Sequence, residues 1–162
     1  MESAKEIYIR MALSAWDTYN GRVDRLLNKL TDEQLGEETA PGRNTAAYLI
    51  GHLIAVSDGL FPILGWGERL YPRLEEIYVK NPDKSGLEKP TLAELRNGWK
   101  EVNERIDEHI RKMQPDQWFE KHEAVSAEDF AKEPHRNKLN IIVSRTSHTS
   151  YHLGQLVYLD RK

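Results

Sequence analysis

Apolar residues recur every three or four positions along four long segments of this chain, which is the spacing of one face of an α-helix. The segments span approximately residues 3–30, 44–64, 91–113 and 138–159. No segment sustains the alternation of apolar and polar residues that is typical of a half-buried strand. The pattern therefore predicts an all-α fold.

Local signals predict where these helices begin and end. Ser3 and Thr91 are each followed by glutamate three residues later, which is the pattern of a capping box at a helix N-terminus. The second helix is expected to begin at Asn44 or Thr45, with Asn44 as its N-cap. Pro62 is expected to kink or end that helix, because proline has no amide hydrogen to donate.

A long connection separates the second and third predicted helices. It is interrupted by proline and glycine, so it is predicted to be irregular, with a short helix near 74–78. Single helical turns are also predicted at 31–34 and 126–129. Because the long connection can run from one end of a bundle to the other, we expect a crossover topology. Residues 1–162 are thus predicted to form one domain, a four-helix bundle with a long crossover connection.

Composition agrees with a soluble globular domain: 39% of the residues are hydrophobic and 30% are charged. The net charge is -3 and no basic patch stands out, which argues against nucleic acid as the main partner. The first residues lack the apolar core of a signal peptide, and no apolar run is expected to be long enough to cross a bilayer. A cytoplasmic protein that does not associate with membranes is expected.

The chain contains no cysteine. Disulfides, thiolate metal ligands and a cysteine nucleophile are therefore excluded. Any metal ion must be held by histidine, carboxylate, amide or water, and any thiol chemistry must take its thiol from a small molecule.

Two histidines near the C-terminus, His148 and His152, are four residues apart. On a helix such residues lie one above the other, so both imidazoles can reach the same metal ion. Neutral imidazole binds zinc, nickel, copper and iron. The pair alone is ambiguous, because most such pairs are surface or core histidines.

A third histidine, His52, lies in the middle of the second predicted helix. Its helical neighbours are apolar or small, so its side chain is expected to point inward. It is either a metal ligand or a core histidine satisfied by a single hydrogen bond. Placed opposite His148 and His152, it completes a three-histidine site with room for water or substrate.

The fourth predicted helix carries a polar stripe between two apolar ends. Its members at helical spacing are Ile141, Arg145, His148, His152, Gln155 and Leu159. Arg145 is expected either to hold a carboxylate of a substrate or small thiol, or to pair with an acidic residue of the bundle. Gln155 is expected either to orient a ligand or bound water, or to be a polar group at the bundle end.

Five other polar residues are candidates for positions near the same site. His109 is expected at the end of the bundle, with entry into the cavity as the alternative. His122 and His135 are expected to be solvent-exposed loop histidines, with acid–base roles as the alternative. Asp58 belongs on a different helical face from His52, so it is not expected to be a ligand. Asn20 is expected either to line the cavity or to face water.

The segment Leu49-Ile50-Gly51-His52-Leu53, together with His148-x-x-Tyr151-His152-x-Gly154-Gln155, resembles the DinB/YfiT-like superfamily of metal-binding four-helix bundles. The resemblance covers nearly the whole chain. It implies a crossover bundle that forms homodimers. It also implies a divalent metal, zinc or nickel, held by His52, His148 and His152.

The activity that the resemblance implies is less uniform. Relatives include thiol S-transferases that use bacillithiol, isomerases that use mycothiol, and proteins described as metal-dependent hydrolases. We therefore expect a metal-dependent enzyme that transfers a low-molecular-weight thiol to a small electrophilic substrate. The alternatives are a metal-dependent hydrolase and a non-catalytic metal- or ligand-binding bundle.

Overall fold

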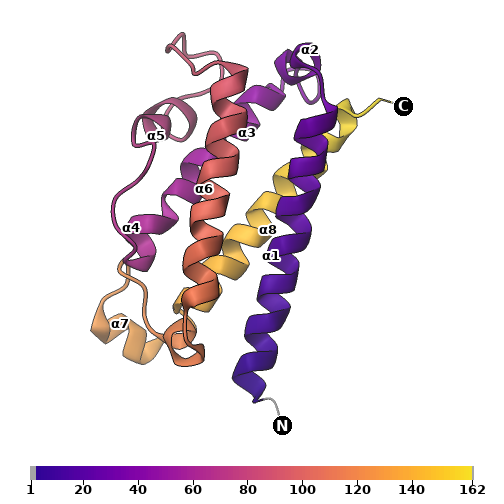
Figure 1. Ribbon diagram of the computed structural model, residues 1–162. Helices are drawn as coiled ribbons and strands as arrows, with labels where there is room; N and C mark the ends of the chain where they lie inside the picture. The colour runs from indigo at the N-terminus through magenta and orange to yellow at the C-terminus, as the bar shows by residue number, and fades with distance from the viewer. Residues whose placement is uncertain (1–2, 162) are drawn as a thin grey trace.

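Four long helices form the body of the protein: α1 (Ala4–Lys29), α3 (Ala46–Asp58), α6 (Leu92–Lys112) and α8 (Lys138–Leu156) (Figure 1). The computed structural model describes residues 3–161. Apart from two isolated β-bridges, this part of the chain contains helices, turns and loops only. The all-α prediction is confirmed.

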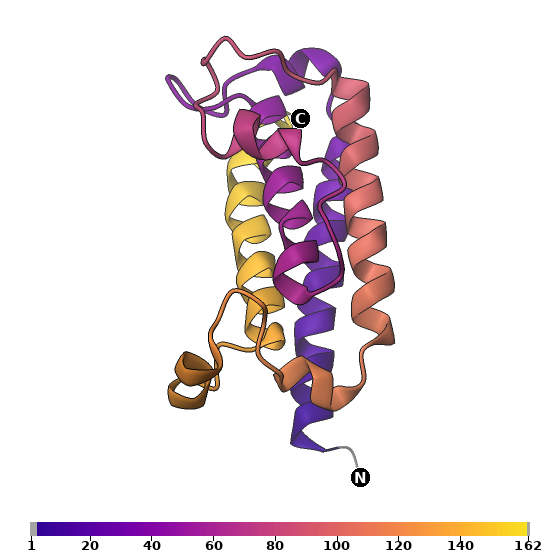
Figure 2. The ribbon, with the colours of Figure 1, turned by 90° about the vertical axis from the view of Figure 1, so that its left-hand side faces the viewer.

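The order of the helices in space confirms the crossover. α1 packs along α8, and α3 packs along α6 and also contacts α8. In Figure 1, α1 and α8 run in one direction while α3 and α6 run in the other. Because the consecutive helices α3 and α6 are parallel, the chain has to return along the bundle between them. The returning segment contains the short helix α5 (Arg73–Tyr78), which packs on the outer side of α3 (Figure 2).

The predicted start of the second helix was wrong by one residue. Thr45, not Asn44, is the N-cap of α3. Its backbone is extended and its hydroxyl accepts a hydrogen bond from the amide of Tyr48 at 3.2 Å. This side-chain bond satisfies one of the amides that have no partner within the helix.

The predicted break at Pro62 was also misplaced. The helix is interrupted earlier, at Gly59, and continues as α4 (Leu60–Leu64). Pro62 is the third residue of α4, within the first turn, where amides have no acceptor inside the helix. Proline is therefore tolerated there. α4 ends at Leu64 and is capped by Gly65, whose φ is 74°.

The remaining elements are short. Three of them were predicted: α2 (Asp32–Gly36), α5 and α7 (Ala127–Lys132). Two 3-10 helices, η1 (Pro115–Phe119) and η2 (Val157–Leu159), were not distinguished in the sequence. The latter continues α8, so the predicted end of the fourth helix holds only in part.

The segment Ala46–Leu64 is 19 residues long and apolar enough to span a membrane by length and composition. This corrects the expectation that no apolar run reaches that length. However, 72% of the relevant window is buried inside the bundle. Helices α5, α6 and α8 all contact α3, which explains why it is apolar around most of its circumference. The segment is thus typical of the core helix of a soluble protein.

α3 approaches the crossover connection closely at Gly51. The ring of Tyr78, the last residue of α5, lies where a Cβ atom on Gly51 would be. Tyr78 is 1% exposed, so its ring has little freedom to move aside. Only glycine therefore permits this contact between α3 and α5.

Gly51→Ala is expected to lower the free energy of unfolding by about 1–3 kcal/mol, because the added methyl group overlaps the Tyr78 ring. Thermal melting of both proteins measures the change. Gly154→Ala is the control: no atom lies within 4 Å of a Cβ at that position on α8. It is expected to be neutral or to stabilise by up to about 1 kcal/mol. Equal melting temperatures for the two variants would contradict the proposed close approach.

Candidate metal centre

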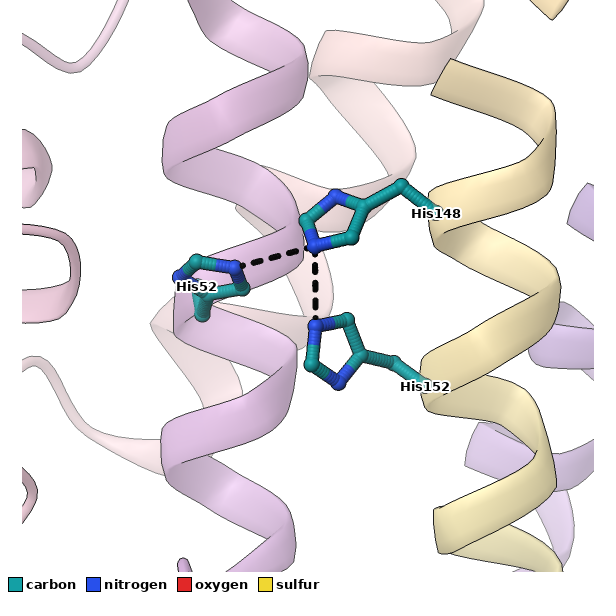
Figure 3. Close-up of side chains that lie close together, drawn as sticks. All are labelled: His52, His148 and His152. Atoms are coloured by element: carbon teal, nitrogen blue, oxygen red, sulfur yellow. Dashed lines mark hydrogen bonds between the residues drawn. The ribbon is translucent and has the colours of Figure 1, made fainter. Parts of the chain in front are cut away.

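Three histidine side chains meet between α3 and α8 (Figure 3). His52 projects from the middle of α3, and His148 and His152 project from consecutive turns of α8. His152 is 8% exposed, whereas the other two are only partly buried. The cluster therefore belongs to the protein interior but can be reached from solvent.

The three Nε2 atoms converge. Nε2 of His148 lies 2.9 Å from Nε2 of His152 and 3.3 Å from Nε2 of His52. Nitrogen ligands about 2.0–2.1 Å from a tetrahedral zinc ion are separated by about 3.3 Å. These two distances are comparable with that value, and the ligand atoms of all three histidines lie within 4.8 Å of one another. The sequence-based ligand set is therefore the set that the fold brings together.

His52 is held by a backbone carbonyl. Its Nδ1 lies 2.8 Å from the carbonyl oxygen of Tyr78, which can only accept a hydrogen bond. The proton of the neutral ring is therefore assigned to Nδ1, which leaves the lone pair of Nε2 directed at the cluster. The hydroxyl of Tyr48 donates to the same carbonyl at 3.2 Å.

His152 has an equivalent arrangement on α8. Its Nδ1 donates to Oε1 of Gln155 at 2.7 Å, so its Nε2 also carries a lone pair that faces the cluster. Gln155 lies in the outer sphere of the site, as an orienting role requires. An acceptor on the outer nitrogen fixes the tautomer and the ring orientation of a metal-binding histidine.

His148 has a different outer partner. Nη1 of Arg145 lies 3.1 Å from its Nδ1, and the guanidinium can only donate. The Nε atom of Arg145 is buried and has no hydrogen-bond partner. Burial and the nearby positive charge of Arg69 lower the pKa of Arg145 to about 10, so it remains charged at neutral pH.

The environment of the two histidines on α8 favours their neutral form. Burial lowers the pKa of His148 to about 4, with further contributions from His152, Arg145 and His52. Burial also lowers the pKa of His152, and the charge of His52 acts in the same direction, while the hydrogen bond to Gln155 opposes the shift. Neutral imidazole is the form that binds metal.

The other three histidines lie outside the cluster. His109 stacks on Trp66 with 4.8 Å between ring centroids, so it does not enter the site. His135 is exposed, as expected. His122 is not: it is 7% exposed, and its Nδ1 accepts a hydrogen bond from the amide of Ala124. The polar residues around His122 predicted an exposed loop, but this short turn folds back against the protein.

Asp58 and Asn20 also have positions away from the three histidines. Asp58 is 0% exposed and accepts hydrogen bonds from the amides of Leu70 and Tyr71, so it organises the start of the crossover connection. Asn20 is buried and lines a groove together with Asn103 of α6. That groove, between α1 and α6, does not include the histidine cluster.

One contributor to the site was missed in the sequence: the carbonyl of Tyr78, which orients His52. Every residue has a backbone carbonyl, so no residue type marks this one. The available signal was the short helix predicted near 74–78, but its contact with α3 depends on the tertiary fold.

Gln155→Ala is expected to weaken binding of zinc to the metal-free protein by about 10–100-fold, because His152 loses the acceptor that fixes its ring. Titration with zinc measures the affinity. Ser150→Ala, on the same helix, is the control and should bind zinc as the wild type does. If both variants bind zinc equally well, Gln155 does not orient the ligand.

The metal-free protein is expected to lose stability as the pH falls from about 6.5 to 4. The folded-state pKa of His148 lies below the ordinary value of 6.5, so the unfolded chain binds more protons in this window. Because His148 is only partly buried, the loss is expected to be on the order of 1–2 kcal/mol. Urea unfolding at pH 7 and pH 5 measures it. His148→Gln should reduce the difference, and an unchanged difference would assign the effect to other groups.

Comparison with known proteins agrees with the fold and the histidine cluster. A sequence model of the DinB superfamily matches residues 15–156, which include all three histidines. No curated protein is similar enough in sequence to match. The match covers most of the chain, and the chain therefore belongs to the DinB superfamily.

Proposed function

We propose that this protein is a metal-dependent enzyme that transfers a low-molecular-weight thiol to a small electrophilic substrate. The observation that carries the proposal is the convergence of the Nε2 atoms of His52, His148 and His152. Within residues 3–161, no other histidine and no carboxylate joins this cluster. Three ligands leave coordination positions for exogenous groups, which is typical of catalytic rather than structural metal sites.

The residues around the cluster fit a divalent ion such as zinc or nickel. An ion held there would lower the pKa of a thiol or water molecule and so supply a nucleophile near neutral pH. The contribution of the protein is to hold neutral imidazoles in place. The Tyr78 carbonyl does so for His52 and the Gln155 side chain for His152. Partial exposure of His52 and His148 leaves access for small molecules.

The absence of cysteine from the chain favours thiol transfer from a small molecule. With no cysteine, the protein has no thiol of its own to attack an electrophile. A nucleophilic sulfur must therefore arrive with a small molecule, and the open positions of the site can accept it. Membership of the DinB superfamily, in which thiol transferases occur, supports the same reaction class.

Two other functions use the same residues. A metal-dependent hydrolase would activate water in place of a thiol, with the same three histidines as ligands. A non-catalytic metal-binding bundle would retain the affinity for metal without turnover.

We also propose a cytoplasmic homodimer. Exposed apolar side chains on the neighbouring helices α1 and α8, such as Met11 and Tyr151, offer a surface for that contact.

The test is a comparison of zinc- and nickel-loaded protein in conjugation of 2-mercaptoethanol or cysteine to 1-chloro-2,4-dinitrobenzene, and in hydrolysis of p-nitrophenyl acetate. Conjugation is expected. Loss of an outer-sphere partner lowers activity by up to about 100-fold. His148→Ala removes a ligand itself, so it should lower the conjugation rate by more than that. His135→Ala, in an exposed loop, is the matched control and should retain the rate.

Three results would contradict the proposal in different ways. Hydrolysis without conjugation would identify a hydrolase. Metal binding without either reaction would identify a binding protein. An unchanged conjugation rate in His148→Ala would show that the histidine cluster is not the reaction site.

A further inference from the structure

The outer partners of the three histidines differ in kind. His52 and His152 each meet an oxygen acceptor, at 2.8 Å and 2.7 Å respectively. His148 instead meets the guanidinium of Arg145, at 3.1 Å from its Nδ1. A guanidinium has N–H donors and no acceptor, so Nδ1 of His148 has to accept. The arrangement around His148 is thus the reverse of the other two.

This reversal determines where the proton of His148 lies. A neutral imidazole that accepts at Nδ1 carries its proton on Nε2. That atom faces the Nε2 lone pairs of His152 and His52, at 2.9 Å and 3.3 Å. A proton on Nε2 of His148 therefore lies between the nitrogens that a metal ion would join.

Metal binding requires the opposite tautomer. With Nε2 of His148 bound to an ion, the proton of the neutral ring must be on Nδ1. An N–H group there would face the N–H group of Arg145, and two donors cannot form a hydrogen bond. The contact between Arg145 and His148 is therefore incompatible with neutral, metal-bound His148.

The charge of Arg145 is not balanced by a carboxylate. None of the ion pairs formed between residues 3 and 161 includes it, and its buried Nε has no acceptor. The nearby cation Arg69 has its own partners, Glu75 at 3.4 Å and the carbonyl oxygen of Ala55 at 2.9 Å. A divalent ion would add two positive charges to this environment. An anion that pairs with Arg145 would offset the cost of burying these charges together.

We propose that metal binding releases Arg145 from His148 and that the freed guanidinium binds a carboxylate of the substrate or thiol. Binding of metal and of carboxylate is then coupled: each ligand raises the affinity of the protein for the other, by the same factor. A guanidinium can hold a carboxylate through two parallel hydrogen bonds, which favours this group over a neutral amide or alcohol. The inference rests on the proposed metal site and adds the substrate class: compounds with a carboxylate.

The coupling can be measured without turnover. Metal-free protein is titrated with zinc, by calorimetry, in an excess of either acetate or its neutral analogue acetamide at constant ionic strength. Acetate is expected to tighten zinc binding about tenfold, within the usual range of coupling between two sites. Acetamide is expected to leave the zinc affinity unchanged.

Arg145→Gln tests the role of the guanidinium. A glutamine oxygen can accept a proton from Nδ1 of His148, as Gln155 does for His152. The variant is therefore expected to bind zinc about tenfold more tightly than the wild type without acetate. Its response to acetate is expected to fall below about twofold. Arg22→Gln, at an exposed position on α1, is the control and should behave as the wild type does.

The possible outcomes are distinct. Equal zinc affinity of the wild type in acetate and acetamide would overturn the inference, whatever the variant does. Weaker zinc binding by Arg145→Gln would also overturn it, because Arg145 would then stabilise a deprotonated His148 and remain in place. If neither protein binds zinc under any condition, the metal site itself is wrong and the proposed function fails with it.

Discussion

Burial of α3 among its neighbours is the constraint on which the rest of the structure depends. This helix contacts α5, α6 and α8. The segment that contains it is apolar enough to span a membrane, and most of it is buried inside the bundle. Packing against α8 sets the distance between His52 and the pair His148 and His152. Packing against α5 brings the Tyr78 carbonyl to the other side of the His52 ring. The burial of α3 therefore positions both His52 and the group that orients its ring.

Much of this arrangement was predictable because it depends on local periodicity. The four long helices follow from the spacing of apolar residues, and the capping boxes at Ser3 and Thr91 form as their sequence patterns indicate. The histidine cluster was predictable for a similar reason. The i, i+4 spacing fixes two imidazoles on α8, and the apolar neighbours of His52 require that it point inward. The sequence thus predicts that the histidine-bearing faces of α3 and α8 both point to the core. It does not predict how far α3 is shifted along α8, which the tertiary fold determines.

The predictions failed where tertiary contacts decide the outcome. The second helix breaks at Gly59, directly after Asp58, whose side chain accepts hydrogen bonds from the amides of Leu70 and Tyr71 in the connection. Likewise, the burial of His122 depends on how its turn folds back, which the polarity of the sequence does not reveal. The contact between Arg145 and His148 was not predicted either. A stripe that places arginine beside histidine indicates proximity, but not which ring nitrogen it meets.

The composition of the cluster has a consequence for the surroundings in which the protein can work. Its candidate ligand atoms are three nitrogens, in a chain without cysteine. An enzyme that handles reactive thiols and electrophiles faces two hazards: mixed disulfides and alkylation at its own cysteines. This protein offers no thiol for either reaction. Under the proposed thiol transfer, redox changes in the thiol pool would therefore alter the supply of the co-substrate without forming a disulfide with the protein itself.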